Sequence, residues 1–409
     1  MSTTSLPPVV LSTDPVSKSP AGLLMAESVV IRPALSVPSR IKTITGFLQF
    51  NGTMSILENA VTLLQNAKKS FEAAGYTVET VRLTTQPFVE YNQPIGPDLV
   101  AFLKQLNDLA GQQGFRMNIG SAMLNDTDDP TGMELLKQIL TTMPNLESSA
   151  IIADTNGIHW KTIALAAELI QYVSWYSSNG EGNFNFAVSA MQSEYSPYFP
   201  GTWLNDEGEQ FGIGLECSGA VRDILLKDKG EYATASTDLA AALPGMLGTA
   251  GTIAQKVALD TSWNGGCGLT TAPGGGDSIA AAVEAYTGER FGGPGTLTAL
   301  QLINQQIPGI MLPVLQDELL AERWGESAFT LESLLTYATV GANGLDAVPL
   351  PGGVSVGQLK RILSDIALMA TKCAVPISAR LVPAPWKQPG KRTSFTREGV
   401  FNTIVQPLG

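Results

Sequence analysis

The chain alternates between two periodic patterns, one typical of strands and one typical of helices. Residues 40–50 are rich in β-branched and aromatic side chains, which favour a strand. Residues 56–74 place apolar side chains three and four positions apart, so they predict a helix with one apolar stripe. A capping box that begins at Ser55 is expected to start this helix, and Gly75 is expected to end it. Residues 77–83 then predict the next strand.

The same order continues along much of the chain. Strands that are joined by helices of this length run parallel, because each connection must return along one face of the sheet. The pattern therefore predicts an α/β fold, either a barrel or a doubly wound sheet. Further helices are expected at residues 98–110, 132–143, 160–177, 277–287, 297–306 and 355–373, and further strands at 115–120, 149–154, 185–191, 310–315 and 377–382.

The N-terminal segment differs in composition from the rest of the chain. Residues 1–39 are rich in serine, proline and threonine and have no sustained period, so they predict a flexible N-terminal extension. No composition break or linker divides residues 40–409, and we expect them to form a single α/β domain.

Composition and charge exclude several classes of protein. With 44% hydrophobic residues the chain can bury a large core, and its formal net charge of −12 repels nucleic acids. No apolar run is long enough to span a membrane, so we expect no membrane association. The three scattered cysteines indicate a reducing, cytoplasmic location. His159 is the only histidine, which excludes His-rich zinc sites and disfavours a Ser-His-Asp mechanism.

Glycine is concentrated between Gly265 and Gly295, in three clusters whose first glycines are Gly265, Gly274 and Gly292, and these clusters are expected to form loops. Two of these glycine clusters run into helical patterns, so the backbone N–H groups at a helix start could bind an anion. Ser278, Thr296 and Gly295 are the candidate ligand-binding residues at these positions. Neither cluster matches a P-loop or a dinucleotide-binding motif, and ordinary turns at strand ends remain the alternative.

Several carboxylates follow glycine loops or strand-like runs. Asp277, Asp317 and Asp346 occupy such positions, and Glu216 ends another apolar run. In parallel α/β folds these ends carry the site, so the four are candidate catalytic residues for acid/base chemistry. The three aspartates are also candidate ligands of a divalent cation such as Mg²⁺, the one cofactor that the sequence suggests. The alternative is that Asp277 and Asp317 are helix N-caps.

The C-terminal segment reverses the charge of the chain. Residues 379–409 contain five basic residues and one acidic residue. Arg380 lies in an expected strand, where a buried guanidinium needs a carboxylate or a bound anion. Arg380 and Lys387 are therefore candidate substrate-binding residues, with structural pairing of Arg380 to an acid as the alternative.

Seven short motifs occur in order along the chain: Ile41–Thr45, Ala74–Leu83, Phe211–Glu216, Phe291–Thr296, Met311–Asp317, Gly344–Gly352 and Arg380–Lys387. This series resembles the domain of unknown function 711 family, and the resemblance covers nearly all of residues 40–409. The resemblance implies a large closed barrel of about ten strands with surrounding helices, similar to pyruvate formate-lyase. Glycyl radical enzymes of that shape carry a C-terminal glycine motif that is absent from residues 401–409, so a glycyl radical enzyme is not expected.

Together these features favour an enzyme that acts on a small anionic metabolite, bearing a carboxylate or a phosphate, by carboxylate acid/base chemistry. A lyase, isomerase or cyclase reaction, with or without a divalent metal, suits the residues better than hydrolysis. The alternative is a non-catalytic sensor or binding protein that uses the same pocket. A small anionic molecule is the expected partner, and a homo-oligomer is compatible with the sequence.

Overall fold

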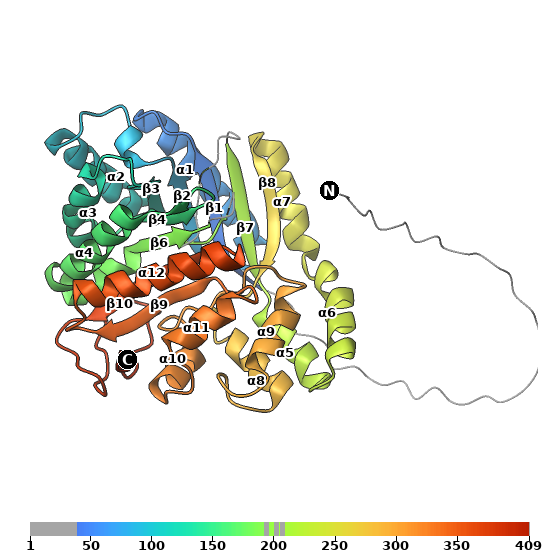
Figure 1. Cartoon of the computed structure of the whole chain (residues 1–409). Coiled ribbons are helices and arrows are strands. Elements are labelled where there is room, and N and C mark those ends of the chain that lie inside the picture. Colours follow the sequence, from blue (N-terminus) through green and yellow to red (C-terminus); the bar gives the residue numbers. More distant parts are fainter. Residues whose placement is uncertain (1–38, 192–195, 200–203, 205–208, 409) are drawn as a thin grey trace, which may run out of the picture. The chain divides into compact units, whose positions relative to one another are not determined.

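The computed structural model describes residues 39–191, 196–199, 204 and 209–408. The expected flexible extension, residues 1–39, lies outside the described residues except for its last position. Leu35–Gly409 form one compact unit. Its sheet has ten strands (Figure 1): β1 (Arg40–Leu48), β2 (Thr77–Thr85), β3 (Arg116–Ser121), β4 (Leu146–Asp154), β5 (Gly157–Ile158), β6 (Phe186–Ala190), β7 (Gln210–Glu216), β8 (Asn264–Thr270), β9 (Gly344–Pro351) and β10 (Ile377–Ala384).

The strand order is β8-β7-β1-β2-β3-β4-β6-β10-β9, with the short β5 paired to β4. The five central strands, β1 to β4 and β6, run parallel. The outer pairs β7/β8 and β10/β9 are each parallel within themselves and antiparallel to the centre. The amino ends of the central strands therefore lie beside the carboxyl ends of the outer strands, and this edge carries the site described below.

The sheet is not closed into a barrel by hydrogen bonds, so the expectation of a closed barrel is corrected. Residues 310–315, which were expected to form a strand, make only isolated bridges from Ile310 to Ala342 and from Pro313 to Asp346. Proline lacks the N–H that a continuous ladder needs at Pro313. The expected α/β class, with a mostly parallel sheet, is confirmed.

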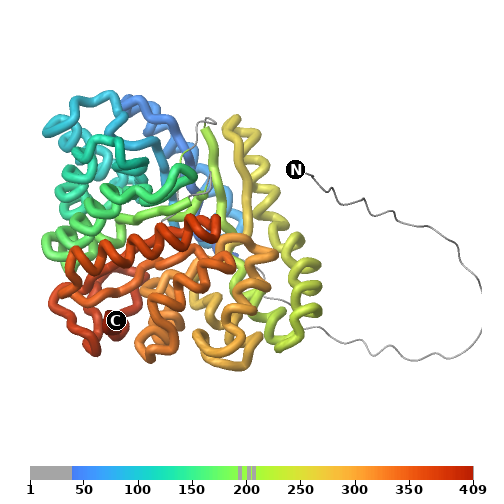
Figure 2. Tube along the Cα trace, in the orientation of Figure 1, coloured from blue at the N-terminus to red at the C-terminus, as the bar shows by residue number. Residues whose placement is uncertain are grey.

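Helices follow the strands and pack against the sheet (Figure 2). Helix α1 contacts β1 and β2, and α12 contacts β4, β10 and α4. No helix of the described part of the chain is long and apolar enough to cross a membrane. The α-helices are α1 (Met54–Ala73), α2 (Pro97–Gln113), α3 (Thr131–Thr142), α4 (Trp160–Tyr176), α5 (Ser218–Lys227), α6 (Tyr232–Met246), α7 (Gly248–Thr261), α8 (Ile279–Thr287), α9 (Thr296–Asn304), α10 (Glu318–Gly325), α11 (Leu331–Ala338) and α12 (Val356–Cys373), and the 3-10 helices are η1 (Phe88–Glu90) and η2 (Ser178–Asn185).

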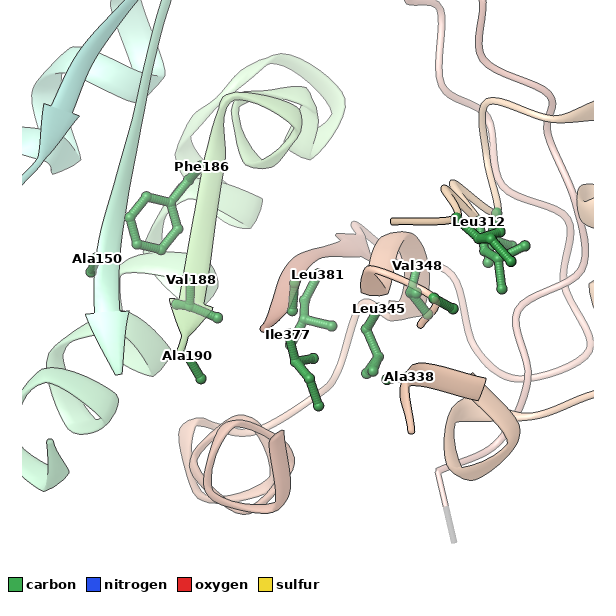
Figure 3. Close-up of a cluster of buried hydrophobic side chains, with 14 of the residues drawn as sticks. Ala150, Phe186, Val188, Ala190, Leu312, Ala338, Leu345, Val348, Ile377 and Leu381 are labelled. Atoms are coloured by element: carbon green, nitrogen blue, oxygen red, sulfur yellow. The ribbon is translucent and has the colours of Figure 1, made fainter. Parts of the chain in front are cut away.

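One large hydrophobic core joins the helices to one face of the strands. Figure 3 shows part of it, where Val188 of β6, Leu381 of β10 and Leu345 of β9 lie buried near one another. The other face of the strands carries polar side chains that line the site, together with a small apolar cluster that includes Ala347 of β9 and Val382 of β10. In β2, for example, Val81 and Leu83 belong to the core while Arg82 between them lines a cavity, because successive side chains point to opposite faces.

Most elements expected from periodicity are present, and two expectations about local signals are wrong. The first helix begins at Met54 after Thr53, which makes no side-chain capping bond, so the capping box at Ser55 does not form. The glycine cluster at Gly265–Gly268 is part of strand β8 and not a loop. Glycine is depleted in strands, so a strand with this composition carries no local signal; pairing with β7 holds it in place.

Candidate functional site

A cavity of about 590 Å³ lies where the amino ends of β1 to β4 meet the carboxyl ends of β7 and β8. Its wall is unusually rich in charged side chains, with six cations and three carboxylates. Most of them come from the polar face of the sheet, which explains why they are directed away from the helices. The charged lining residues are Arg40, Lys42, Glu79, Arg82, Arg116, Glu147, Arg380, Arg397 and Glu398.

Glu147 of β4 joins two arginines from neighbouring strands. The Arg82 Nε donates a hydrogen bond of 2.8 Å to one carboxylate oxygen, and the Arg116 Nε lies 3.4 Å from the other. Burial of Glu147 by itself would raise its pKa, but the two guanidinium groups outweigh this effect and lower the pKa to about 2. Glu147 is therefore a fixed negative charge, and it is unsuited to exchange protons near neutral pH.

Arg380 of β10 is held by groups from three other segments. Its Nε pairs with the fully buried carboxylate of Asp346 in β9, and one terminal nitrogen donates a 2.6 Å hydrogen bond to the Gln316 side chain. The other terminal nitrogen lies 3.5 Å from the Phe184 carbonyl oxygen. The structural pairing that was the alternative for Arg380 is thus present, and the same guanidinium also lines the cavity.

Arg397 brings a further positive charge to the same wall. It shares the Asn185 side-chain oxygen with Arg116, at 2.9 and 2.7 Å respectively. Burial lowers the pKa of Arg397 to about 9, and the charges of Arg116 and Arg380 contribute to the decrease. A buried guanidinium with other cations beside it is costly, and a bound anion would lower that cost. We refer to Arg82, Arg116, Arg380 and Arg397 as the arginine cluster.

An aromatic ring lies against the arginine cluster. The Phe199 ring centroid is 6.0 Å from the guanidinium carbon of Arg82 and 5.5 Å from that of Arg380. Guanidinium groups pack favourably on aromatic faces, so Phe199 supports both side chains without neutralising their charge. The same segment is held to the sheet by the Thr45 hydroxyl, which donates a 2.7 Å hydrogen bond to the Pro197 carbonyl.

A second group of charges lines another part of the cavity wall. Lys42 of β1 pairs with Glu79 of β2 and donates a 2.8 Å hydrogen bond to the Pro273 carbonyl. Arg40 lies within ion-pair distance of both Glu79 and Glu216, at 3.6 and 3.3 Å. Burial of Glu216 at the end of β7 raises its pKa to about 7. Glu216 is therefore able to gain or lose a proton near neutral pH, unlike Glu147.

The glycine loop after β8 packs directly on these side chains. A Cβ atom at Gly274 would lie 2.3 and 2.4 Å from the two Glu216 carboxylate oxygens, and one at Gly275 would lie 2.8 Å from the Arg40 Cδ. A larger residue at Gly274 would therefore displace Glu216. One of the glycine clusters thus forms part of the cavity wall. It contributes through the backbone of Gly274 and Gly275 and not through the N-terminus of a helix.

The three aspartates that the sequence singled out have different local partners. Asp317 is the N-cap of α10, where it accepts a hydrogen bond from the Leu320 N–H. Asp346 pairs with Arg380, and the Asp277 carboxylate lies against Gly219 of α5. Among the described residues, no three His, Cys, Asp or Glu side chains form a group that could hold a metal ion. The structure therefore does not assemble the expected metal site of Asp277, Asp317 and Asp346.

The other candidate binding residues do not line the cavity with Arg380. Ser278 is the N-cap of α8 and accepts a hydrogen bond from the Ala281 N–H. Gly295 precedes the first turn of α9, and the Thr296 hydroxyl accepts a 3.0 Å hydrogen bond from the Gly292 N–H. Lys387 lines a separate pocket beside Trp386. Ser278, Gly295 and Thr296 therefore have local turn and capping roles, which was the alternative stated for the glycine clusters.

Several cavity residues were not identified from the sequence. Arg82, Arg116 and Glu147 were overlooked because each lies inside or at the start of a strand rather than after its carboxyl end. A usable signal existed in β2, where Thr80, Arg82 and Thr84 alternate with apolar residues. Such an alternation predicts one polar face, and a charged residue in that face needs a partner or a ligand.

The fold and the site together define an α/β protein with a cationic cavity on the polar face of its sheet. The chain matches the family described as Uncharacterised ACR (DUF711) over residues 40–397, and it belongs to that family.

Relatives include a UPF0210 protein of Pyrobaculum aerophilum, which is 28% identical over 343 residues, covering 77% of this chain and 75% of the relative. A UPF0210 protein of Methanosarcina acetivorans is 24% identical over 331 residues, covering 73% and 70%. Among solved structures, an anaerobic ribonucleotide reductase aligns with a TM-score of 0.39 and 9% identity, over 83% of this chain and 70% of that one.

Proposed function

We propose that this protein is an enzyme that binds a small anionic metabolite in the cavity and transforms it by carboxylate acid/base chemistry. The substrate class is a carboxylate or a phosphate ester, and a lyase, isomerase or cyclase reaction suits the available groups. The observation that supports the proposal is the arginine cluster, whose four guanidinium groups are paired with only two carboxylates, Glu147 and Asp346, among the described residues.

The excess charge is a local property of the cavity. The whole chain carries a formal net charge of −12, so the cluster opposes the charge of the protein around it. Guanidinium groups present planar forks of N–H donors that match carboxylate and phosphate oxygens. In a partly buried cavity an anion would therefore gain hydrogen bonds and relieve the mutual repulsion of Arg116, Arg380 and Arg397.

Proton transfer in this cavity falls to carboxylates. Its described lining contains neither histidine nor cysteine. Glu147 is held ionised by its arginines, while the pKa of Glu216 is raised to about 7 by burial. A general acid or base works best when its pKa is near the working pH, so Glu216 and the groups around it are the proposed source of the acid/base chemistry.

The first test is anion binding, measured by titration calorimetry with inorganic phosphate, a sugar phosphate and a dicarboxylate. We expect Arg397→Gln to weaken the binding of the preferred anion by about tenfold or more, since a hydrogen bond to a charged group contributes about 1.5–3 kcal/mol. Arg361→Gln, at an exposed position on α12, is the matched control and should bind like the wild type.

Failure of the wild-type protein to bind any of these anions would refute the proposed cavity function. If one of the anions binds, it should be incubated with the protein and the mixture analysed for products. Saturable binding without conversion of any bound compound would favour the alternative, a non-catalytic sensor or binding protein.

A further inference from the structure

We propose that Glu79 and Glu216 share one proton at neutral pH, and that Glu79 exchanges this proton with the molecule bound in the cavity. The inference rests on the proposed function, and it adds Glu79 as the residue that meets the substrate. Glu216 is then a positioning residue, which holds the shared proton at a more buried position than Glu79.

The environment of Glu216 favours a protonated carboxyl group. Its side chain is 1% exposed, and among the described residues no donor gives either carboxylate oxygen a hydrogen bond. The Arg40 Nε lies 3.3 Å from one oxygen but does not point a hydrogen at it. A buried carboxylate without hydrogen bonds is costly, and binding a proton removes most of that cost.

The position of Glu79 explains where this proton goes. Both carboxyl groups lie against one guanidinium, with an Arg40 terminal nitrogen 3.6 Å from Glu79 and the Arg40 Nε 3.3 Å from Glu216. Burial, and to a smaller degree the charge of Glu79 and a hydrogen bond with it, raise the pKa of Glu216. Two ionised carboxylates only accept hydrogen bonds, so a bond between them requires one shared proton. The Glu79 side chain is 34% exposed and lines the cavity, whereas Glu216 lies behind it. A bound molecule therefore meets the pair through Glu79.

The surrounding charges suit a change in the protonation of the pair. Lys42 and Arg40 face the pair from β1, and the loop after β8 adds the Pro273 carbonyl, which accepts a hydrogen bond from Lys42. The carboxylate of Asp277 in the same loop lies against Gly219 of α5. With one shared proton the pair carries a single negative charge. When this one shared proton passes through Glu79 to the substrate, neither carboxyl group keeps a proton, and the pair reaches two negative charges opposite two cations. Uptake of one proton from product or solvent restores the starting state.

The test is infrared difference spectroscopy of the carboxyl C=O stretch during a pH titration of the purified full chain. We expect the wild type to show a buried protonated carboxyl near neutral pH. Glu216→Gln should abolish this band. Glu79→Gln should shift its titration midpoint downward by about one pH unit or more, because the like charge of Glu79 no longer raises the Glu216 pKa. Glu58→Gln, at an exposed position on α1, should leave both band and midpoint unchanged.

Two results would overturn the pair. One is the absence of any protonated carboxyl band above about pH 6 in the wild type, and the other is an unchanged midpoint in Glu79→Gln. Neither result depends on the arginine cluster, because the titration is made without any added anion. Loss of the proposed function would instead appear as absent phosphate, sugar phosphate or dicarboxylate binding in the wild type, so the two failures are distinguishable.

Discussion

Replacement of Glu147 by glutamine should destabilise the protein by about 3 kcal/mol at neutral pH. The two arginines lower the pKa of this buried carboxyl from its ordinary value of 4.5 to about 2. That difference in pKa corresponds to about 3 kcal/mol, at about 1.4 kcal/mol for each pKa step. Because the folded-state pKa is the lower one, this stability is present above about pH 4.5 and is lost as the pH falls toward 2.

The assay is urea unfolding of wild type and Glu147→Gln at several pH values between about 2 and 7, which spans the range in which the carboxyl titrates. The free energy of unfolding should differ by about 3 kcal/mol at pH 7 and converge at low pH. Glu134→Gln is the control, because Glu134 pairs with Lys137 on an exposed helix surface and such pairs contribute about 0.5 kcal/mol or less.

The same variant also tests the charge balance of the cavity. Glu147→Gln removes one of the two carboxylates that neutralise the arginine cluster, so the variant should bind phosphate more tightly than the wild type.

An unfolding free energy of Glu147→Gln within about 0.5 kcal/mol of wild type at pH 7 would refute the predicted loss of stability. It would mean that Arg82 and Arg116 do not hold Glu147 in the way the hydrogen bond and the ion pair indicate.

Three further predictions concern single positions. Arg380→Gln should cost about 3–5 kcal/mol in urea unfolding, since it leaves the buried Asp346 without its partner, and a cost below about 1 kcal/mol would contradict the ion pair. Burial raises the pKa of Glu216 from 4.5 to about 7, so this group should lower wild-type stability by about 3 kcal/mol between about pH 4.5 and 7. In urea unfolding across this range, the unfolding free energy of Glu216→Gln should fall less steeply than that of the wild type. A remaining slope would come from groups such as Asp317, whose pKa burial also raises, and equal slopes would contradict the shift of Glu216. Gly274→Ala should lower the melting temperature, because its Cβ would clash with the Glu216 carboxylate, whereas Gly266→Ala meets open space and should change it little.

Local sequence patterns predicted much of the secondary structure because their causes are local. Apolar spacing of three and four residues identified the helix at Met54–Ala73, and β-branched runs identified β1 and β2. The capping box at Ser355 forms, whereas the one expected at Ser55 does not. Strand β8 could not be found in this way, since its glycines have no strand preference and pairing with a neighbour decides its conformation.

The candidate site was predicted only in part, for the same physical reason. Glu216 and Arg380 were identified because each combines a charged side chain with a strand-like context. The three aspartates do not form the expected metal-binding group. Asp317 accepts a hydrogen bond from a helix N–H, and Asp346 pairs with the Arg380 guanidinium. The position of a residue after a strand does not reveal such partners.

By itself the sequence determined the α/β class, the acidic character of the chain and its single histidine, since these follow from local periodicity and from composition. Only the tertiary structure decided that Arg82, Arg116, Arg380 and Arg397 meet in one cavity. They come from three strands and the C-terminal segment, and the order of strands in the sheet brings them together. That order depends on long-range pairing and burial, which no window along the chain contains.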